Sequence, residues 1–351
     1  KTGGMMAVDL SEAVKKSGNG GNPLSQKSES LTRDAIRRLL KNRAAVIGGI
    51  IIILLYLMMI FADKIAPYDY ATQVLSEQNA VPPWLTKVFP VMESYAKPPV
   101  DNPNKYILGA DYVGRDLLSR IIYGSRVSLI IAIIGPLISL IIGVLYGCIA
   151  GFFGGRVDNF MMRIVDILYA FPGLLFTILL MTFFRTALSK PDPGTFGEAL
   201  SFLDNSLGGM LFIIIGIGLT AWETMARLTR GQVLSIKEKE FIEAARSIGS
   251  TDRRIMFKHI LPNIIEPLVI SETLAIPGYI NTEAFLSFIG LGVNPPTPSW
   301  GSMISDGSKV VRTYPNQTIF PALMLALTMF AFNFLGDGLR DALDPQMRGK
   351  S

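Results

Sequence analysis

Charged side chains are scarce in this chain: 17% of its 351 residues are Asp, Glu, Lys or Arg, whereas 50% are hydrophobic. Soluble domains contain about 25% charged residues, and a chain of this length would ordinarily fold as two such domains with charged surfaces. The shortage of charge therefore indicates that much of the chain is in contact with lipid instead of water.

Cysteine and histidine are nearly absent, since Cys148 and His259 each occur once. One cysteine excludes an intrachain disulfide, and one histidine excludes the HExxH metalloprotease motif and other sites built on paired histidines. The chain also has no P-loop, because Asp344 stands where the first glycine would precede Gly349-Lys350-Ser351. We expect no catalytic residue, cofactor or metal in this chain, and no ATP hydrolysis by it alone.

Long apolar runs are what the chain does contain. Residues 44–62 carry no charge, and 19 residues at a rise of about 1.5 Å reach about 28 Å, close to the thickness of a bilayer core. A cleaved signal peptide is the alternative for this run, but the run is long and far from the N-terminus. Five more apolar segments follow at residues 127–153, 164–184, 207–228, 264–291 and 317–336. The sequence predicts an all-α polytopic membrane protein with six transmembrane helices.

Lysine and arginine are distributed unevenly between the two sides of these segments. With the N-terminus inside, the inner segments hold 22 of them and the outer segments 11. Because basic loops favour the cytoplasm, we expect both termini there. The excess of Lys and Arg is spread over the segments on one side of the membrane and forms no single basic patch. Nucleic-acid binding is therefore not expected.

This topology divides the chain into five parts. They are a cytoplasmic tail (1–43), the first span (44–62), an extracytoplasmic segment (63–126), a five-span core (127–339) and a cytoplasmic tail (340–351). In the extracytoplasmic segment, Asp116 and Arg120 are four residues apart and can pair on a short interfacial helix near 114–120. The sequence assigns no role to residues 1–6 or to the long outer segments 67–103 and 185–209.

The loop between the fourth and fifth spans, about 235–262, has a helical pattern. Phe241, Ala244, Ala245 and Ile248 recur at helical spacing and form one apolar stripe among Lys and Glu. A solvated loop would not require such a stripe on the side away from the membrane. The pattern therefore indicates a docking element for a cytoplasmic partner.

The ends of this docking element are also marked in the sequence. Gly249 suits the left-handed position that follows a helix. Ser250 or Thr251 can cap a second helix with Asp252 in its first turn, and that helix should end before Pro262. The loop is thus expected to form a helix-turn-helix projection.

Polar residues occur inside the later spans. Arg163 and Asp166 are three apart and can pair where the third span enters the membrane, and Phe171-Pro172 should bend that helix.

The fifth span contains Glu272, Asn281 and Glu283, with Pro277-Gly278 between the two acids. Carboxylates inside a membrane are candidates for function, so these residues either line or gate a translocation path or form interhelical hydrogen bonds. The sequence favours neither role over the other.

Several motifs resemble one known family. Glu243-Ala244-Ala245, with Gly249 after three residues and Leu261-Pro262 further on, resembles the EAA motif of the membrane subunits of binding-protein-dependent ABC importers, although His259 stands where the broad motif has Ile. Other blocks resemble the C-subunit type of oligopeptide and dipeptide permeases, and together they cover about residues 31–348. These blocks include Gly114-Arg115-Asp116, Ala170-Phe171-Pro172, Pro295-Pro296-Thr297-Pro298-Ser299-Trp300 and Leu335-Gly336-Asp337.

The resemblance implies a type I ABC importer fold with a cytoplasmic coupling helix. In this family the EAA loop contacts an ATPase subunit, which gives that role to Glu243, Ala244, Ala245, Ile248 and Gly249. The implied partners are a second homologous permease, two ATPase subunits that bind ATP and Mg²⁺, an extracytoplasmic substrate-binding protein, a peptide and membrane lipid. The implied location is the inner or plasma membrane of a bacterium or archaeon.

Two alternatives to a peptide importer stay open. Close relatives of such permeases carry nickel chelates or saccharides, and the spans do not separate these cargoes. A polytopic intramembrane enzyme that uses Asp166, Glu272 or Glu283 is the other alternative, although an enzyme would not need the docking element in the fourth loop.

Overall fold

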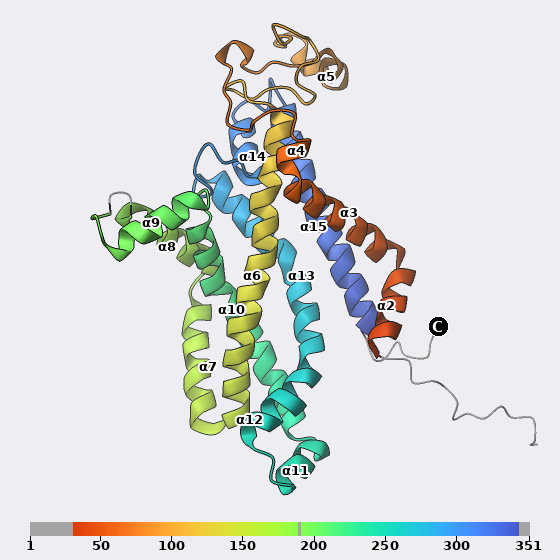
Figure 1. Cartoon of the computed structure of the whole chain (residues 1–351), viewed down its shortest axis with the longest axis vertical. Coiled ribbons are helices and arrows are strands. Elements are labelled where there is room, and N and C mark those ends of the chain that lie inside the picture. Colours follow the sequence, from red (N-terminus) through yellow and green to blue (C-terminus); the bar gives the residue numbers. More distant parts are fainter. Residues whose placement is uncertain (1–30, 189–190, 344–351) are drawn as a thin grey trace, which may run out of the picture.

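The computed structural model describes residues 31–188 and 191–343 (Figure 1). Within these ranges every regular element is a helix, and β pairing is limited to two isolated bridges near the start of the chain. The predicted all-α fold is therefore confirmed. Most of the two predicted tails, residues 1–30 and 344–351, lies outside the described residues.

Within residues 31–188 and 191–343, five helices are long and apolar enough to cross a bilayer. They are α3 (Arg43–Ile60), α6 (Leu117–Phe153), α10 (Leu211–Lys237), α13 (Leu261–Phe288) together with the turns that lead into it, and α15 (Asn316–Leu343). A sixth apolar stretch consists of α7 (Gly155–Ala170) and α8 (Gly173–Ala187), which are bent by 82° relative to each other. The described residues thus form six spans if this bent pair counts as one, and the predicted third span, 164–184, crosses the bend.

The predicted bend at Phe171-Pro172 is confirmed. Phe171 has an extended backbone (φ −88°, ψ 133°) at the end of α7, as expected for a residue before proline, which is disfavoured in the α region. The predicted pair of Arg163 with Asp166 is wrong. The Asp166 carboxylate instead accepts a hydrogen bond from Arg227 of α10 at 2.8 Å, because α7 packs beside α10.

Close helix packing in the core depends on glycine. Along one face of α6, Gly143, Gly147 and Gly151 recur at intervals of four residues and contact α10. Small residues at this spacing let two backbones approach closely inside a membrane. Apolar side chains of α6, α10 and α13 then fill the remaining space.

The first span lies against the last one. The short helix α2 (Leu31–Lys41) and α3 both pack on α15 (Figure 1). Gly48 of α3 and Gly338 of α15 make the closest approaches: a Cβ on Gly48 would lie 2.6 Å from the carbonyl oxygen of Ala331.

The segment between α3 and α6 folds over one end of the bundle, beside α14 (Trp300–Ser308) (Figure 1). Its elements are α4 (Ala62–Ile65), η1 (Leu75–Glu77), α5 (Pro83–Val88) and η2 (Pro90–Met92). A salt bridge of 3.2 Å joins Lys105 to the buried Glu77 inside it. Hydrogen bonds from Arg126 and Tyr123 hold the pKa of the Asp63 carboxyl below its usual value and fix α4 to α6.

The start of α6 differs from the expected interfacial helix at 114–120. Asp116 caps α6 by accepting a hydrogen bond of 2.7 Å from the backbone N–H of Ser119, and the helix continues without interruption to Phe153. Arg120 does not pair with Asp116 but approaches Asp111 at 3.5 Å. The cap uses the Oδ2 atom of Asp116, while the Arg120 guanidinium is directed toward Asp111 instead. The long outer segment after α8 contains one further helix, α9 (Phe196–Ser206).

Candidate functional site

A short helix, α11 (Glu240–Ser247), lies at the end of the bundle opposite α5 (Figure 1). It follows α10 and is followed by α12 (Asp252–Arg254), the π-helical turn η3 (Ile255–Ile260) and α13. All five residues predicted to couple to an ATPase lie on α11 or in the turn that ends it.

The C-terminus of α11 is capped by backbone hydrogen bonds that require a residue with a left-handed backbone conformation. Gly249 has φ +81°, and its N–H donates to the carbonyl of Arg246 at 2.9 Å, while the N–H of Ser250 donates to Ala245 at 3.0 Å. This is the Schellman arrangement, in which glycine supplies the positive φ. Thr251 then caps α12 by accepting from the N–H of Arg254.

The second helix of the projection does not end before Pro262, which corrects that expectation. Residues 252–288 form one helical path into the membrane, with the π turn of η3 directly before Leu261-Pro262. Proline lacks the N–H that an α-helix interior uses, and a π turn changes the local bonding register. The chain therefore accommodates Pro262 without breaking the helix.

The two sides of α11 have different surroundings. Ile242 and Ala245 are buried, whereas Phe241, Ala244 and Ile248 are exposed and Ile248 is 83% exposed. The apolar stripe expected from the sequence thus has one member, Ala245, on the inner side. The three exposed residues, spaced i, i+3 and i+7, form an apolar surface that this chain leaves uncovered; we call it the α11 surface.

The buried side of α11 is joined to the base of the bundle. Ile242 and Ala245 belong to one apolar cluster with residues of α6, α10, η3 and α13. Arg246 lies over the ring of Phe152 at the end of α6, and Lys237 at the end of α10 donates a hydrogen bond of 2.5 Å to the Phe152 carbonyl. The buried side of α11 is therefore in direct contact with the ends of these membrane helices.

The sequence did not reveal Ile242 as this anchor. The helical period groups apolar residues on one face, but the period does not say which face meets the protein and which meets a partner. Ile242 is apolar and lies three residues before Ala245, which was the available signal.

Glu272 of α13 is buried between α13 and α6. Ser139 of α6 donates a hydrogen bond to its carboxylate at 3.2 Å, and the Tyr279 hydroxyl donates another at 2.5 Å. Glu283 is fully buried about one turn beyond Tyr279 on the same helix and accepts from Ser128 of α6 at 2.9 Å and from Ser287 at 2.7 Å. Both acids thus form interhelical hydrogen bonds.

Asn281 lies between these acids in sequence but on a different side of α13. It is exposed, so of the three residues proposed for a translocation path it alone is accessible on the surface of this chain.

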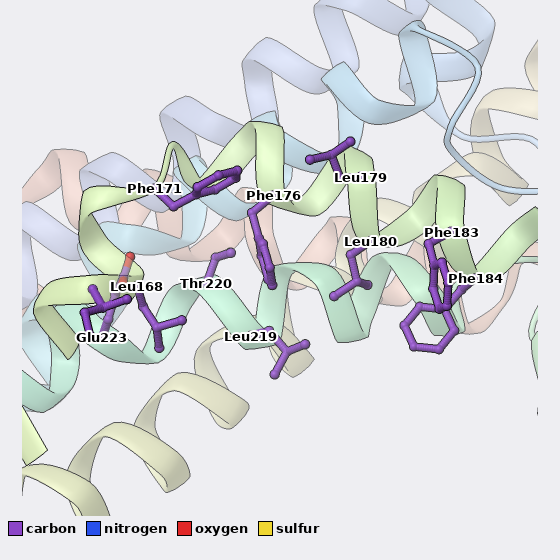
Figure 2. A pocket seen from close by; sticks show the side chains of 12 residues that line it. Leu168, Phe171, Phe176, Leu179, Leu180, Phe183, Phe184, Leu219, Thr220 and Glu223 are labelled. Carbon is purple, nitrogen blue, oxygen red and sulfur yellow. The ribbon is translucent and has the colours of Figure 1, made fainter. Parts of the chain in front are cut away.

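An apolar pocket of about 670 Å³ lies between α10 and the bent α7–α8 pair (Figure 2). Phe171, Phe176 and Leu180 point into it together with other Phe and Leu side chains, and Glu223 lies at one end (Figure 2). Because this pocket is so apolar, it offers few hydrogen-bond partners to the peptide groups of a ligand. It suits an apolar helix or a lipid chain instead.

These features define a multi-pass, all-helical membrane protein with a helix-turn-helix projection at one end. The family model described as "Binding-protein-dependent transport system inner membrane component" matches residues 143–349, and the model for the N-terminal TM domain of oligopeptide transport permease C matches residues 30–83. The chain belongs to the family of binding-protein-dependent transport system inner membrane components, as the motifs indicated.

Individual relatives are similar over nearly their whole length. The chain is 41% identical to the oligopeptide transport system permease protein OppC of Bacillus subtilis over 93% of each chain. It is 39% identical to the dipeptide transport system permease protein DppC of the same organism, over 92% of this chain and 88% of the relative.

A solved structure shows the same fold. It is a chain of the MetNI methionine ABC transporter in an inward-facing conformation, with a TM-score of 0.50 and 18% identity over 65% of this chain and 98% of that chain. The predicted type I ABC importer fold is confirmed.

Proposed function

We propose that this chain is one of two different transmembrane subunits of an ATP-driven importer of oligopeptides or dipeptides, and that it forms half of the translocation path. Its family and its resemblance to peptide permeases support this function. The observation that carries the coupling role is α11, which has an uncovered apolar surface on one side and a buried anchor on the other.

The α11 surface is the docking site for a cytoplasmic ATPase subunit in this proposal. Ala244 keeps the centre of the surface small, so that a cleft in the ATPase can approach the helix backbone, and Glu243 and Gly249 flank it. When ATP binding moves the ATPase, Ile242 and Ala245 transmit the displacement to α6, α10 and α13. The helices then alternate between inward and outward access.

The remaining partners are assigned by the same proposal. An apolar helix of the second permease fills the pocket between α10 and the α7–α8 pair, and Asn281 faces the translocation path. Glu272 and Glu283 contribute to the path indirectly by holding α13 to α6. The extracytoplasmic binding protein docks on the end of the bundle that bears α5, and both termini lie in the cytoplasm.

Ile248→Asp tests the docking role. This variant should insert and fold normally, because the Ile248 side chain is exposed. It should lose most of the peptide uptake and most of the stimulated ATPase activity when reconstituted with the partner subunits. The matched control Ile248→Leu, which keeps an apolar side chain, should retain both. Unchanged uptake in Ile248→Asp would refute the docking role.

The cargo needs a separate measurement. Vesicles that contain the complete transporter and its binding protein should take up a labelled oligopeptide or dipeptide in the presence of ATP. Nickel chelates and saccharides should not compete with that uptake. Uptake of either of these in place of the peptide would keep the transporter class and overturn peptide as the cargo.

A further inference from the structure

A second pocket lies at the end of the molecule away from α11, where the start of α6, the loop after α13 and α14 meet. Its volume is about 220 Å³, and its lining includes the side chains of Arg115, Arg120 and Lys309. The proposed function assigns no role to this pocket.

Arg120 is the unusual member of the lining. Its side chain is buried, with 4% of the residue exposed, and among the described residues its Nη1 atom has no hydrogen-bond partner. Its Nε atom is 3.5 Å from Asp111 Oδ2, but the closer partner of that oxygen is Arg115 Nε at 2.7 Å. A buried guanidinium with an unused donor is costly unless a further acceptor is present.

The charges around the pocket point to the kind of acceptor. Arg115, Arg120 and Lys309 contribute three positive charges, whereas Asp306 in the lining and Asp111 beside it contribute two negative charges. Glu283, whose carboxylate accepts a hydrogen bond from the lining residue Ser287, is a further buried acid beside the pocket. The excess of positive charge therefore belongs to the lining residues alone, whose charged members are three cations and Asp306.

Asp116 does not line the pocket; its Oδ2 atom accepts from the N–H and hydroxyl of Ser119 at the start of α6, and its buried Oδ1 atom has no hydrogen-bond partner among the described residues. An anionic group in the pocket would offset positive charge of the lining and supply an acceptor for Arg120.

We propose that this pocket binds one small oxyanion group, a carboxylate or a phosphate, to which Arg120 Nη1 donates a hydrogen bond. Lys309, whose side chain is 72% exposed, contributes charge at the mouth, and Arg115 contributes charge from the buried side. The volume accommodates such a group and not a whole oligopeptide, because pockets for larger ligands enclose about 300–1,000 Å³. This site is independent of the proposed transport function.

A single water molecule is the competing explanation for Arg120. A neighbouring void of about 10 Å³, bordered by Arg120, Asp111 and Gln317, is close to the smallest space that holds one water. A water there would satisfy Nη1 without any ligand, and the pocket would then have no affinity for anions.

Thermal unfolding of the purified full chain separates the two explanations. At constant ionic strength set with chloride, inorganic phosphate or acetate should raise the Tm by about 2 °C near saturation. Lys309→Met should weaken the apparent affinity about three-fold by removing one charged contact. Lys87→Met, the same change on α5 outside the pocket, should leave the affinity unchanged.

The source of the anion follows from two further probes. A shift with alanylalanine that is absent with its C-terminal amide identifies a peptide-type carboxylate, and a shift with phosphate alone identifies a phosphate group. The proposal is overturned if no probe shifts the Tm, or if the shift is equal in the wild type and Lys309→Met. Arg120→Lys is the second pocket variant, and it should lose the shift if it folds.

Discussion

At the scale of single residues, the distance between α6 and α10 depends on the absence of a side chain at Gly147. A Cβ there would lie 2.4 Å from the carbonyl oxygen of Ala226 and 2.6 Å from Thr229 Cβ. The backbone of α10 cannot move aside without disturbing the whole helix pair. We expect Gly147→Ala to destabilise the protein by about 1–3 kcal/mol, as overpacking does, and thermal unfolding in detergent measures this.

Gly231 provides the matched control. It lies on α10, and a Cβ there would meet nothing within 4 Å. Because alanine is the better helix former by about 0.5–1 kcal/mol, Gly231→Ala should raise the Tm slightly. The same Gly→Ala substitution should thus lower the Tm at position 147 and raise it at position 231. A lower Tm in both variants, or in neither, would contradict this account of α6 and α10 packing.

Glu283 tests whether a buried acid serves packing or transport. In Glu283→Leu the hydroxyl of Ser128 loses its acceptor, so we expect a loss of about 1–3 kcal/mol in unfolding free energy. In Glu283→Gln the remaining oxygen can accept from Ser287 while the new NH2 group donates to the hydroxyl oxygen of Ser128, so this variant should retain both most of the stability and peptide uptake. Unfolding and uptake should be measured on the same preparations. Normal stability with lost uptake in Glu283→Gln would instead give the carboxylate charge a direct role in the path.

At the scale of elements, α11 depends on the left-handed residue that ends it. Gly249 has φ +81°, and space around it is open, so a substitution acts through the backbone and not through a clash. Gly249→Ala should cost about 1–2 kcal/mol locally and fray the last turn of α11. Gly249→Asn should cost less, because asparagine tolerates this conformation.

Hydrogen exchange on α11 and ATPase stimulation measure the two consequences. Exchange of the amides of Gly249 and Ser250 should accelerate in Gly249→Ala more than in Gly249→Asn, and coupling to the ATPase should fall in the same order. Equal exchange in the two variants would mean that the Schellman hydrogen bonds do not hold the end of α11.

Elements set by local sequence were predictable, whereas contacts made only by tertiary packing were not. The charge-free run at 44–62 and the Phe171-Pro172 bend were predictable, because hydropathy and the restriction before proline act locally. The partner of Asp166 was not predictable, because Arg227 is adjacent only after α7 packs on α10. Likewise, helical spacing grouped Ala244 with Ala245, but tertiary packing decided which of the two is buried.

At the scale of the whole molecule, two features lie at opposite ends of the bundle. The helix α11 is at one end, while α14, which contributes to the lining of the oxyanion pocket, and the folded segment with α5 are at the other (Figure 1). The docking proposal therefore depends on which end meets the cytoplasm, whereas anion binding by the purified chain does not. The twofold excess of Lys and Arg on the α11 side is the argument for orientation, and it predicts that α11 is inside.

Cysteine labelling tests this orientation, because the native Cys148 is buried and can be replaced by Cys148→Ser. In that background we add Glu93→Cys in the α5 segment or Ser247→Cys on α11, both at exposed positions. A membrane-impermeant maleimide applied to spheroplasts should label Glu93→Cys at once and Ser247→Cys only after the membrane is opened. The Cys148→Ser background should stay unlabelled throughout. The reverse pattern would place α11 outside, where no ATPase could reach it, and the coupling role of α11 would fail together with the orientation.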